Sequence, residues 1–383
     1  MTEFDKEYLR LLREILNNGV EVENRTGINT IKIPEFHFSF DLNHEFPILQ
    51  TKQMFYRQAV TEMLWIWQMG SNDVRELHER NVHIWDEWMV DSDGIYRIYE
   101  PSGKYDPDKE VEVLDPLSTP VDNPFGELKP KYDETGKVMT TKGLIEGKTI
   151  KSAKYYGKEF AYTIGTAYGF ITNRYQHARN LINTIKNNPT DRRMVKSLWQ
   201  DEFLRTAVLP SCVWSTEWDV TDGKLNLFVH QRSCDVPLGL PFNVTQYACF
   251  LEMIAQVTNL KPGTINYSIK DAHVYVNQLD GVKEQLRRED RYNELSKLDR
   301  EELLKLRDSA EEKRDSFDKG TKEYNELDTE YRIIDLILEP THPKLELNEE
   351  IDDFFKFDNS KELKHVKVKS YKHMGKITFP IAQ

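Results

Sequence analysis

The sequence has few cysteines, no long apolar run and no excess of positive charge. Among its 383 residues are three cysteines, Cys212, Cys234 and Cys249, an odd and sparse set without the spacing of a metal site. No apolar run approaches the roughly 20 residues that a membrane helix needs, and the first residues contain no apolar signal core. These absences favour a cytoplasmic protein of a reducing compartment, without a membrane segment, a bound metal or a disulfide framework.

The charge balance limits which partners the chain can bind over a wide surface. Its 52 lysines and arginines stand against 64 aspartates and glutamates, which gives a net charge of −12. A negative total disfavours a general nucleic-acid surface. A phosphate-bearing ligand would therefore need a local cluster of basic side chains.

Apolar residues recur with recognisable periods in the first seventy residues. A helical spacing from Tyr8 to Leu16 ends at Asn17-Asn18-Gly19 and predicts an amphipathic helix. Alternating apolar residues on both sides of Pro34 predict half-buried strand from Ile31 to Leu42. Residues 54–69 leave almost no polar face, so they predict a central helix that is buried on most sides.

Two segments differ in composition from the rest of the chain. Residues 89–160 are rich in proline and glycine, which predicts an irregular insertion with short strands, in the simplest case a solvated surface loop. Residues 288–338 are rich in Glu, Lys, Arg and Leu and predict a charged helical hairpin that turns at Gly320. Such a hairpin can be a solvent-exposed addition to the fold, cover a dimer edge or contact a partner.

A thiol, a guanidinium, a carboxylate and an amide occur close together between residues 210 and 243. Cys212 follows Pro210-Ser211, the run Gln231–Asp235 comes after a predicted strand, and Asn243 closes Gly239–Asn243. A nearby cation lowers the pKa of a cysteine and makes thiolate available, and a turn or hairpin would bring Arg232 back to Cys212. On its own, Cys212 would equally suit a buried packing position.

Glu62 and Asn243 each have a chemical and a structural interpretation. A carboxylate in the apolar helix 54–69 predicts a raised pKa and a proton relay, whereas a buried ion pair would be the structural account. Asn243 precedes an apolar run, which predicts a helix N-cap. Its amide can also accept from N3–H and donate to O4 of uracil, a pattern that cytosine does not match.

The ordered blocks of this chain resemble the thymidylate synthase family, which includes the phage pyrimidine hydroxymethylases. The resemblance runs from Asp5 to Trp88, from Tyr162 to about Arg287, and again near the C-terminus. The matching blocks are Arg25-Thr26-Gly27, Thr51-Lys52, Glu62–Trp65, Ile84–Trp88, Tyr168-Gly169, Arg192-Arg193, Cys212, Gln231–Asp235, Leu238–Asn243 and Asp271–Tyr275.

The resemblance implies a fold and an assembly. We expect an α+β fold of the thymidylate synthase type, with a large mixed β-sheet flanked by helices. It would be a single domain over residues 1–383 that carries the two insertions at about 89–160 and 288–338. Two such chains would form a back-to-back homodimer, in which the phosphate-binding arginines are contributed in trans.

The resemblance also implies roles for individual residues. The catalytic residues would be Cys212, Glu62, Tyr168, Arg232 and Asn243. The substrate dUMP would be bound by Arg25, Arg192, Arg193, Gln231, Arg232, Ser233, Asp235, Asn243, His273 and Tyr275. The co-substrate 5,10-methylenetetrahydrofolate would be held by Ile84, Trp85, Asp235, Leu238, Gly239 and Ala382, with no metal ion. Independently of the family, a predicted strand places His273 and Tyr275 on one face.

In the implied mechanism, Cys212 attacks C6 of dUMP, C5 captures the methylene group, and loss of the C5 proton leads to an exocyclic methylene. Hydride from tetrahydrofolate then gives dTMP, whereas water gives 5-hydroxymethyl-dUMP, and the site chooses by admitting or excluding water. The positions that depart from the synthase pattern are Gln50, Ile171, Ser211, Lys270, Gln278 and the terminal Gln383.

These departures favour a dUMP hydroxymethylase of a bacterial or phage-infected host cytoplasm, with thymidylate synthase as the alternative. A third possibility, a catalytically silent relative that binds a nucleotide or RNA, is disfavoured by the presence of Cys212, Glu62 and Asn243 and by the acidic charge.

Overall fold

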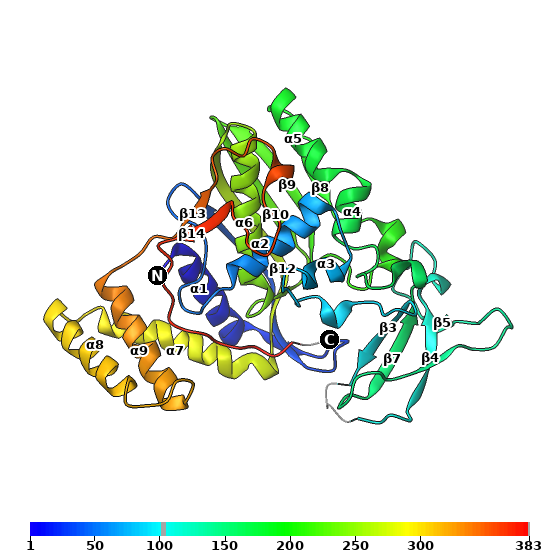
Figure 1. The fold of residues 1–383 in the computed structure, drawn as a ribbon, viewed down its shortest axis with the longest axis horizontal. Helices are drawn as coiled ribbons and strands as arrows, with labels where there is room; N and C mark the ends of the chain where they lie inside the picture. The colour runs from blue at the N-terminus through cyan, green and yellow to red at the C-terminus, as the bar shows by residue number, and fades with distance from the viewer. Residues whose placement is uncertain (101–104, 382–383) are drawn as a thin grey trace. The chain divides into compact units, whose positions relative to one another are not determined.

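The computed structural model describes residues 1–100 and 105–381, which fall into two compact units. Unit 1 comprises residues 1–60, 219–352 and 363–381, and unit 2 comprises residues 61–218 and 353–362. The chain passes between the units within α2 (Tyr56–Leu64) and within β9 (Val213–Thr221). Figure 1 labels the elements along the chain. Each unit mixes helices and strands, which agrees with the predicted α+β class.

A mixed sheet forms the centre of unit 1. Its strands lie in the order β1 (Val20–Val22), β2 (Thr30–Asp41), β12 (Lys261–Tyr275) and β10 (Lys224–Gln231), and β11 (Cys234–Asp235) also pairs with β12. The pairing of β12 is antiparallel with β2 and parallel with β10 and β11. Two helices pack on this sheet, α1 (Glu3–Asn18) against β2 and α6 (Gly239–Val257) against β12 and β10.

The first helix and the long second strand form where the sequence predicted them. Thr2 caps α1 by accepting from the Asp5 N–H, the Asp5 carboxylate accepts in return, and the helix ends at Gly19. Strand β2 is continuous across Pro34 instead of divided by it. Ile33 pairs with Ala272 and Glu35 with Lys270, so Pro34 lies opposite Asp271, whose φ is 54°. A ladder interrupted at this point tolerates a residue without an N–H.

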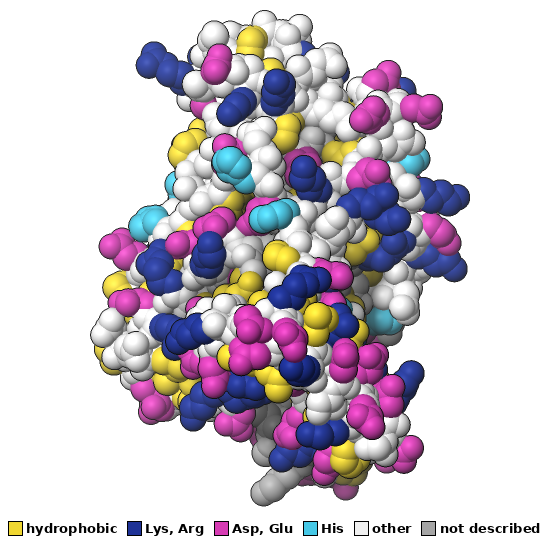
Figure 2. Space-filling model, turned by 90° about the vertical axis from the view of Figure 1, so that its left-hand side faces the viewer, with side chains coloured by type: hydrophobic (Ala, Val, Ile, Leu, Met, Phe, Trp, Pro, Cys, Tyr) yellow, Lys and Arg dark blue, Asp and Glu magenta, His cyan; other side chains and the backbone are white. Residues whose placement is uncertain are grey.

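The charged segment predicted as a hairpin belongs to a group of three helices in unit 1. The first residues of the charged segment belong to helix α7 (Leu279–Leu295). The next two helices, α8 (Arg300–Arg314) and α9 (Lys322–Leu338), are joined by a turn that contains Gly320 at φ 92°. The helices share a small core of Leu295, Leu303, Ile333, Ile334 and Leu336 with Met374. Figure 2 shows the face of the molecule that lies on the left of Figure 1, and on this face acidic and basic side chains are interspersed.

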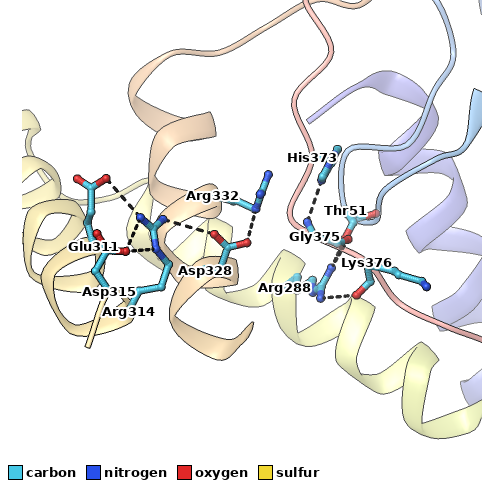
Figure 3. Close-up of polar contacts among 10 residues, drawn as sticks. All are labelled: Thr51, Arg288, Glu311, Arg314, Asp315, Asp328, Arg332, His373, Gly375 and Lys376. Atoms are coloured by element: carbon cyan, nitrogen blue, oxygen red, sulfur yellow. Dashed lines mark hydrogen bonds and ion pairs between the residues drawn. The ribbon is translucent and has the colours of Figure 1, made fainter. Parts of the chain in front are cut away.

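The last segment of unit 1 is fixed to α7 by one buried arginine (Figure 3). The Nη1 atom of Arg288 donates to the carbonyls of Thr51 at 2.9 Å and Gly375 at 3.1 Å, and Nη2 donates to Lys376 at 3.4 Å. The N–H of Gly375 donates to Nδ1 of His373 at 3.1 Å. Burial and the nearby Arg332 lower the pKa of His373 to about 4. The remaining strands of this unit, β13 (Lys344–Leu347) and β14 (Val366–Lys369), pair with each other.

Unit 2 contains the proline-rich insertion, which is more regular than the sequence predicted. Its strands β3 (Ile95–Tyr99), β7 (Ile150–Tyr155), β4 (Glu110–Asp115) and β5 (Lys129–Pro130) form a sheet in this order, and β6 (Thr140–Lys142) also pairs with β4. Residues Ile95, Tyr99, Val113, Ile150 and Ala153 form a core of their own. Residue Ile95 pairs with Tyr155, so the insertion closes where it begins.

The other elements of unit 2 are mostly short. They are a π-helix (Trp65–Met69), α3 (Val74–His78), α4 (Gly169–Arg174), α5 (His177–Asn187), β8 (Val195–Ser197), and 3₁₀ turns at Asp86–Trp88, Pro116–Ser118, Lys158–Phe160, Asp201–Thr206 and Phe354–Lys356, with another in unit 1 at Val276–Gln278. The helix predicted over residues 54–69 is therefore α2 followed by a π-helical turn. Within the described residues, no helix is long and apolar enough to cross a membrane.

Candidate active site

Cys212 lies in unit 2 directly before β9 and is partly exposed. Its backbone N–H donates to the hydroxyl oxygen of Tyr168 at 2.8 Å, so the phenol lies beside the residue that carries the thiol. Sequence reasoning placed these two residues in one reaction although 43 residues separate them in the chain. The structure brings them into direct contact.

Glu62 and Trp85 connect to the same group within unit 2. The indole Nε1 of Trp85 donates to Oε1 of Glu62 at 2.7 Å, and both side chains are buried. The rings of Trp85 and Tyr168 meet edge to face with centroids 5.5 Å apart. The carboxylate, the indole, the phenol and the cysteine backbone thus form one continuous chain of contacts. Glu62 thus accepts a hydrogen bond from a neutral donor within this group.

The backbone at Tyr168 explains why glycine follows it. Tyr168 has φ 44° immediately before α4, an uncommon conformation for an aromatic residue. A Cβ atom on Gly169 would lie 1.7 Å from the carbonyl oxygen of Ser71, which is far inside van der Waals contact. Only glycine fits this approach, and the tight turn aims the Tyr168 side chain at Cys212.

The amide predicted to recognise the base lies in unit 1. Oδ1 of Asn243 accepts from Nε2 of Gln231 at 3.2 Å, and its Nδ2 donates to Gln246 at 3.3 Å. The second lone pair of Oδ1 and the second hydrogen of Nδ2 remain as possible bonds to a base. Oε1 of Gln231 is buried and has no hydrogen-bond partner among the described residues, which marks a polar position that a ligand could satisfy.

The predicted N-cap at Asn243 is wrong. Helix α6 begins four residues earlier, at Gly239, and its N-cap Leu238 makes no side-chain capping bond. Pro241 lies in the first turn, where an α-helix needs no N–H donor, so the proline favours the earlier start. Asn243 therefore points its amide from within the helix instead of capping the helix end, and it is free of a capping role.

Three further residues of unit 1 meet around Asp271. The Ser233 hydroxyl donates to its Oδ2 at 3.3 Å, and Lys32 lies 3.2 Å from its Oδ1. The ring of His273 contacts Tyr275 edge to face with centroids 5.2 Å apart, as expected for residues two apart on β12. Nδ1 of His273 lies 3.0 Å from the Asp271 carbonyl, and Nε2 of the same ring is a group suited to a sugar hydroxyl.

Asp235 forms a second polar cluster in unit 1. The Leu238 N–H donates to it at 3.1 Å, and Nε2 of Gln278 donates to it at 3.0 Å and also to the Pro380 carbonyl at 3.1 Å. Burial raises the pKa of Asp235. Gln278 thereby links this carboxylate to the C-terminal segment. The predicted folate contact Ala382 and the terminal Gln383 lie outside the described residues.

Lys52 belongs to this cluster, although sequence reasoning gave it no role. Its Nζ donates to the Pro237 carbonyl and lies 4.7 Å from the centroid of the Phe379 ring. Burial lowers the pKa of Lys52 to about 7, against the opposing attraction of Asp235. The sequence signal was a lysine directly after the apolar and uncharged run of residues 46–51, a context in which lysine is rarely buried unless it is paired.

The arginines predicted to bind phosphate differ in exposure. Arg25 is exposed between β1 and β2, and Arg192 and Arg193 are exposed before β8. Arg193 forms a bidentate contact with Asp191 at 2.9 and 3.0 Å, while Arg232 is half-buried at the end of β10.

Three positions that depart from the synthase pattern have accounts in packing. Gln50 is buried, its N–H donates to Asp5, and its Nε2 donates to Thr341 at 2.9 Å. Ile171 is buried in α4, and Lys270 is exposed on β12 beside Glu35. Gln50 and Ile171 are thus part of the interior of the fold, and Lys270 is part of its surface.

Comparisons with known proteins identify the family of the chain. A family model described as thymidylate synthase matches residues 6–318. The thymidylate synthase of Clostridium beijerinckii is 39% identical over 294 residues, 76% of this chain and 86% of the relative. That of Bacillus phage phi3T is 32% identical over 308 residues, 76% and 85% of the two chains. The solved structure of thermostable thymidylate synthase A from Bacillus subtilis aligns over 100% of both chains with a TM-score of 0.62 and 28% identity.

Proposed function

Because the chain belongs to the thymidylate synthase family, we propose that it transfers a one-carbon unit from 5,10-methylenetetrahydrofolate to C5 of dUMP. The observation that carries this proposal is the contact of Tyr168 with Cys212, joined through Trp85 to the buried Glu62. A nucleophile, a phenol and a carboxylate in one continuous group are what addition at C6 and proton removal at C5 require.

In the proposed mechanism, the Cys212 thiolate adds to C6 of the uracil ring, and negative charge develops on O4. Glu62 donates a proton to this oxygen and accepts it back, directly or through water. C5 then forms a bond to the methylene carbon of the folate. Tyr168 then assists removal of the C5 proton, because its hydroxyl is held beside the nucleophile. Elimination of tetrahydrofolate leaves the exocyclic methylene on the base. Hydride from the released tetrahydrofolate would then reduce this methylene, giving dihydrofolate, and loss of the Cys212 thiolate from C6 would restore the C5–C6 double bond of dTMP.

The residues of unit 1 would bind and select the nucleotide. Asn243, oriented by Gln231, would accept from N3–H and donate to O4, which selects uracil over cytosine. His273 and Tyr275 would bind the ribose hydroxyl from one face of β12. Asp235 would meet the pterin ring nitrogens, and its raised pKa suits a carboxyl group that exchanges a proton with a heterocycle.

A dimer is part of this proposal. One face of the unit 1 sheet is buried under α1 and α6, while the other presents the alternate residues His37 and Ser39 of β2 together with Phe228 of β10, which is 41% exposed. An aromatic side chain on an open sheet face favours a covering partner. A second chain on this face would cover it and would supply Arg192 and Arg193 to the phosphate of the first.

We propose reductive methylation to dTMP as the outcome, in place of the hydroxymethylation that the sequence departures favoured. The matched relatives are named thymidylate synthases, including one from a phage. Gln50, Ile171 and Lys270 have packing or surface positions that account for them, so they no longer support capture of water. Ser211 and Gln278 are the departures that lie next to proposed catalytic or folate-binding residues.

The experiment is product analysis with purified protein, dUMP and 5,10-methylenetetrahydrofolate. We expect a product with the mass of dTMP and an equimolar rise in the absorbance of dihydrofolate. A product with the mass of 5-hydroxymethyl-dUMP and no dihydrofolate would establish the hydroxymethylase instead. The control is Cys212→Ser, in which turnover should fall by about five to six orders of magnitude, the scale for loss of a nucleophile. Turnover near that of the parent would reject covalent catalysis by Cys212.

A further inference from the structure

His78, His83 and Asp86 form a cluster of metal-ligating side chains on the surface of unit 2. Their ligand atoms all lie within 4.8 Å of one another. Nε2 of His78 lies 2.6 Å from one carboxylate oxygen of Asp86, and Nδ1 of His83 lies 3.1 Å from the other. The two imidazole rings stack with centroids 4.9 Å apart. Two nitrogens and a carboxylate therefore converge on one point.

The backbone holds these ligands in place before any ion arrives. His78 is the last residue of α3, and the turn after it is closed by bonds from the Asn81 N–H to the His78 carbonyl at 2.9 Å and from Val82 to Leu77 at 3.0 Å. Val82 and Trp85 are buried, whereas the neighbouring His83 and Asp86 are exposed. Ligands on anchored backbone lose little freedom when they bind an ion.

We propose that His78, His83 and Asp86 bind a first-row divalent cation, with Zn²⁺ as the ion that fits them best. Two imidazoles and one carboxylate are ligands that zinc accepts, with about 2.0 to 2.2 Å to each atom and about 3.3 Å between ligand atoms in a tetrahedral site. The present separations reach this geometry after small rotations of the side chains. Among the described residues, Asp86 forms no ion pair with a lysine or an arginine that would oppose a cation.

The ion would fix the segment that carries Trp85. This residue lies between the ligands His83 and Asp86, and its indole is the donor to Glu62. Binding at both sides of Trp85 would restrict the indole and hence the orientation of the carboxylate. The cluster therefore acts as a positioning device for Glu62 as well as a metal site. Sequence reasoning looked for cysteine spacing and missed it, although the pattern of His78, His83 and Asp86 is visible in the chain.

The experiment is calorimetric titration of ZnCl₂ into the full chain, free of tags and previously treated with a chelator. We expect one equivalent to bind, and we expect His83→Gln and His78→Gln each to weaken this binding by more than about 100-fold, since even outer-shell changes cost 10- to 100-fold. His44→Gln is the matched control, because His44 is an exposed histidine 3.9 Å from Asp41 without a second imidazole. It should bind zinc as the parent does.

A zinc–thiolate site is the main competing source of binding, and Cys212→Ser separates the two. This variant should still bind one equivalent of zinc, since it leaves all three proposed ligands intact. Loss of zinc binding in Cys212→Ser, retention of it in both histidine variants, or the absence of stoichiometric binding in the parent would each overturn the proposal. None of these outcomes depends on turnover, so they are independent of the proposed function.

A second measurement locates the ion through fluorescence. Cu²⁺ at the cluster should quench tryptophan emission strongly, because Trp85 and Trp88 are near neighbours of the ligands, with ring centroids 5.6 Å apart from each other. In His83→Gln, we expect Cu²⁺ to quench tryptophan emission only as strongly as an unbound ion in solution does. Because the His83 side chain is 58% exposed, this variant should melt like the metal-free parent. Equal quenching in a folded His83→Gln protein would contradict the assigned location.

Discussion

The hydroxyl oxygen of Tyr168 accepts the backbone N–H of Cys212 at 2.8 Å. The backbone of Cys212 makes this bond, which places a phenol next to the residue that carries the proposed nucleophile. It also fixes the tyrosine at the end of a turn that tolerates only glycine at residue 169. The reactivity of Cys212 and the position of Tyr168 are therefore expected to change together.

Tyr168→Phe tests this relationship. We expect kcat to fall by about 10²- to 10⁴-fold, the scale of a general acid–base group, with a smaller change in the KM for dUMP. Release of isotope from C5 of labelled dUMP measures the step directly and should slow in parallel. Tyr175→Phe is the control in the same unit, because its hydroxyl bonds the exposed Glu202. Equal rates in parent and Tyr168→Phe would remove Tyr168 from the mechanism.

Asn243→Asp tests recognition of the base. A carboxyl group can accept from the exocyclic amine of cytosine and, when protonated, donate to its N3, so the variant should shift kcat/KM from dUMP toward dCMP. The parent should discriminate against dCMP by about 10⁴-fold, since mismatch leaves buried polar groups unpaired. Competition between the two nucleotides, resolved by mass, gives the ratio. A parent enzyme that uses both nucleotides equally well would exclude recognition by Asn243.

The proposed exchange of arginines between subunits predicts complementation. A protein with Arg192→Ala and Arg193→Ala should be nearly inactive, as should Cys212→Ser. After the two are mixed, unfolded and refolded together, half of the dimers carry one chain of each kind. In these dimers one site has both an intact thiol and intact arginines, so about a quarter of the parental activity should return. If the arginines act within their own chain, the mixture will stay inactive.

The lowered pKa of His373 predicts that the folded chain loses stability as the pH falls. The pKa of His373 is about 4 in the folded chain, because of burial and Arg332, and near 6.5 when unfolded. The unfolded state thus binds the proton first, so this contribution to stability is complete above about pH 6.5 and is lost as the pH falls toward 4. His373→Asn keeps an acceptor for the Gly375 N–H and should flatten this part of the profile.

Urea unfolding measured at several pH values across this window tests the prediction. Carboxylates also titrate there, so the comparison is with His342→Gln, which removes an exposed histidine paired only with Glu45. That variant should keep the parental slope. The idea fails if His373→Asn loses stability in acid as steeply as the parent does.

Much of the fold followed from short-range patterns. Residues 8–16 and Gly19 were sufficient to define α1, and alternation on both sides of Pro34 was sufficient for β2. Asn243 misled, because an asparagine before an apolar run has the same signature whether it caps a helix or lies within one. Pro241 was the signal that the helix begins earlier, since proline is favoured in a first turn.

For the candidate site, the sequence predicted which residues take part but not how they contact one another. Cys212, Tyr168, Glu62 and Trp85 came from the resemblance, and the contacts among them depend on tertiary packing that no local pattern contains. The link from Gln278 to Asp235 and Pro380 could not be predicted from the sequence, because these partners lie 43 and 102 positions apart in the chain. The departures from the synthase pattern could not be interpreted from the sequence for the same reason: packing decides whether Gln50 or Lys270 contacts solvent, substrate or core.

The proline-rich insertion of unit 2 begins and ends on paired strands, with Ile95 opposite Tyr155. Directly paired residues in adjacent strands have Cα atoms about 5 Å apart, so a tight turn between these two positions would span the same gap. Evolution can therefore lengthen, shorten or exchange everything between them at little cost to the proposed catalytic residues of the same unit. The insertion is a place where a new binding module can be grafted while turnover of the nucleotide continues.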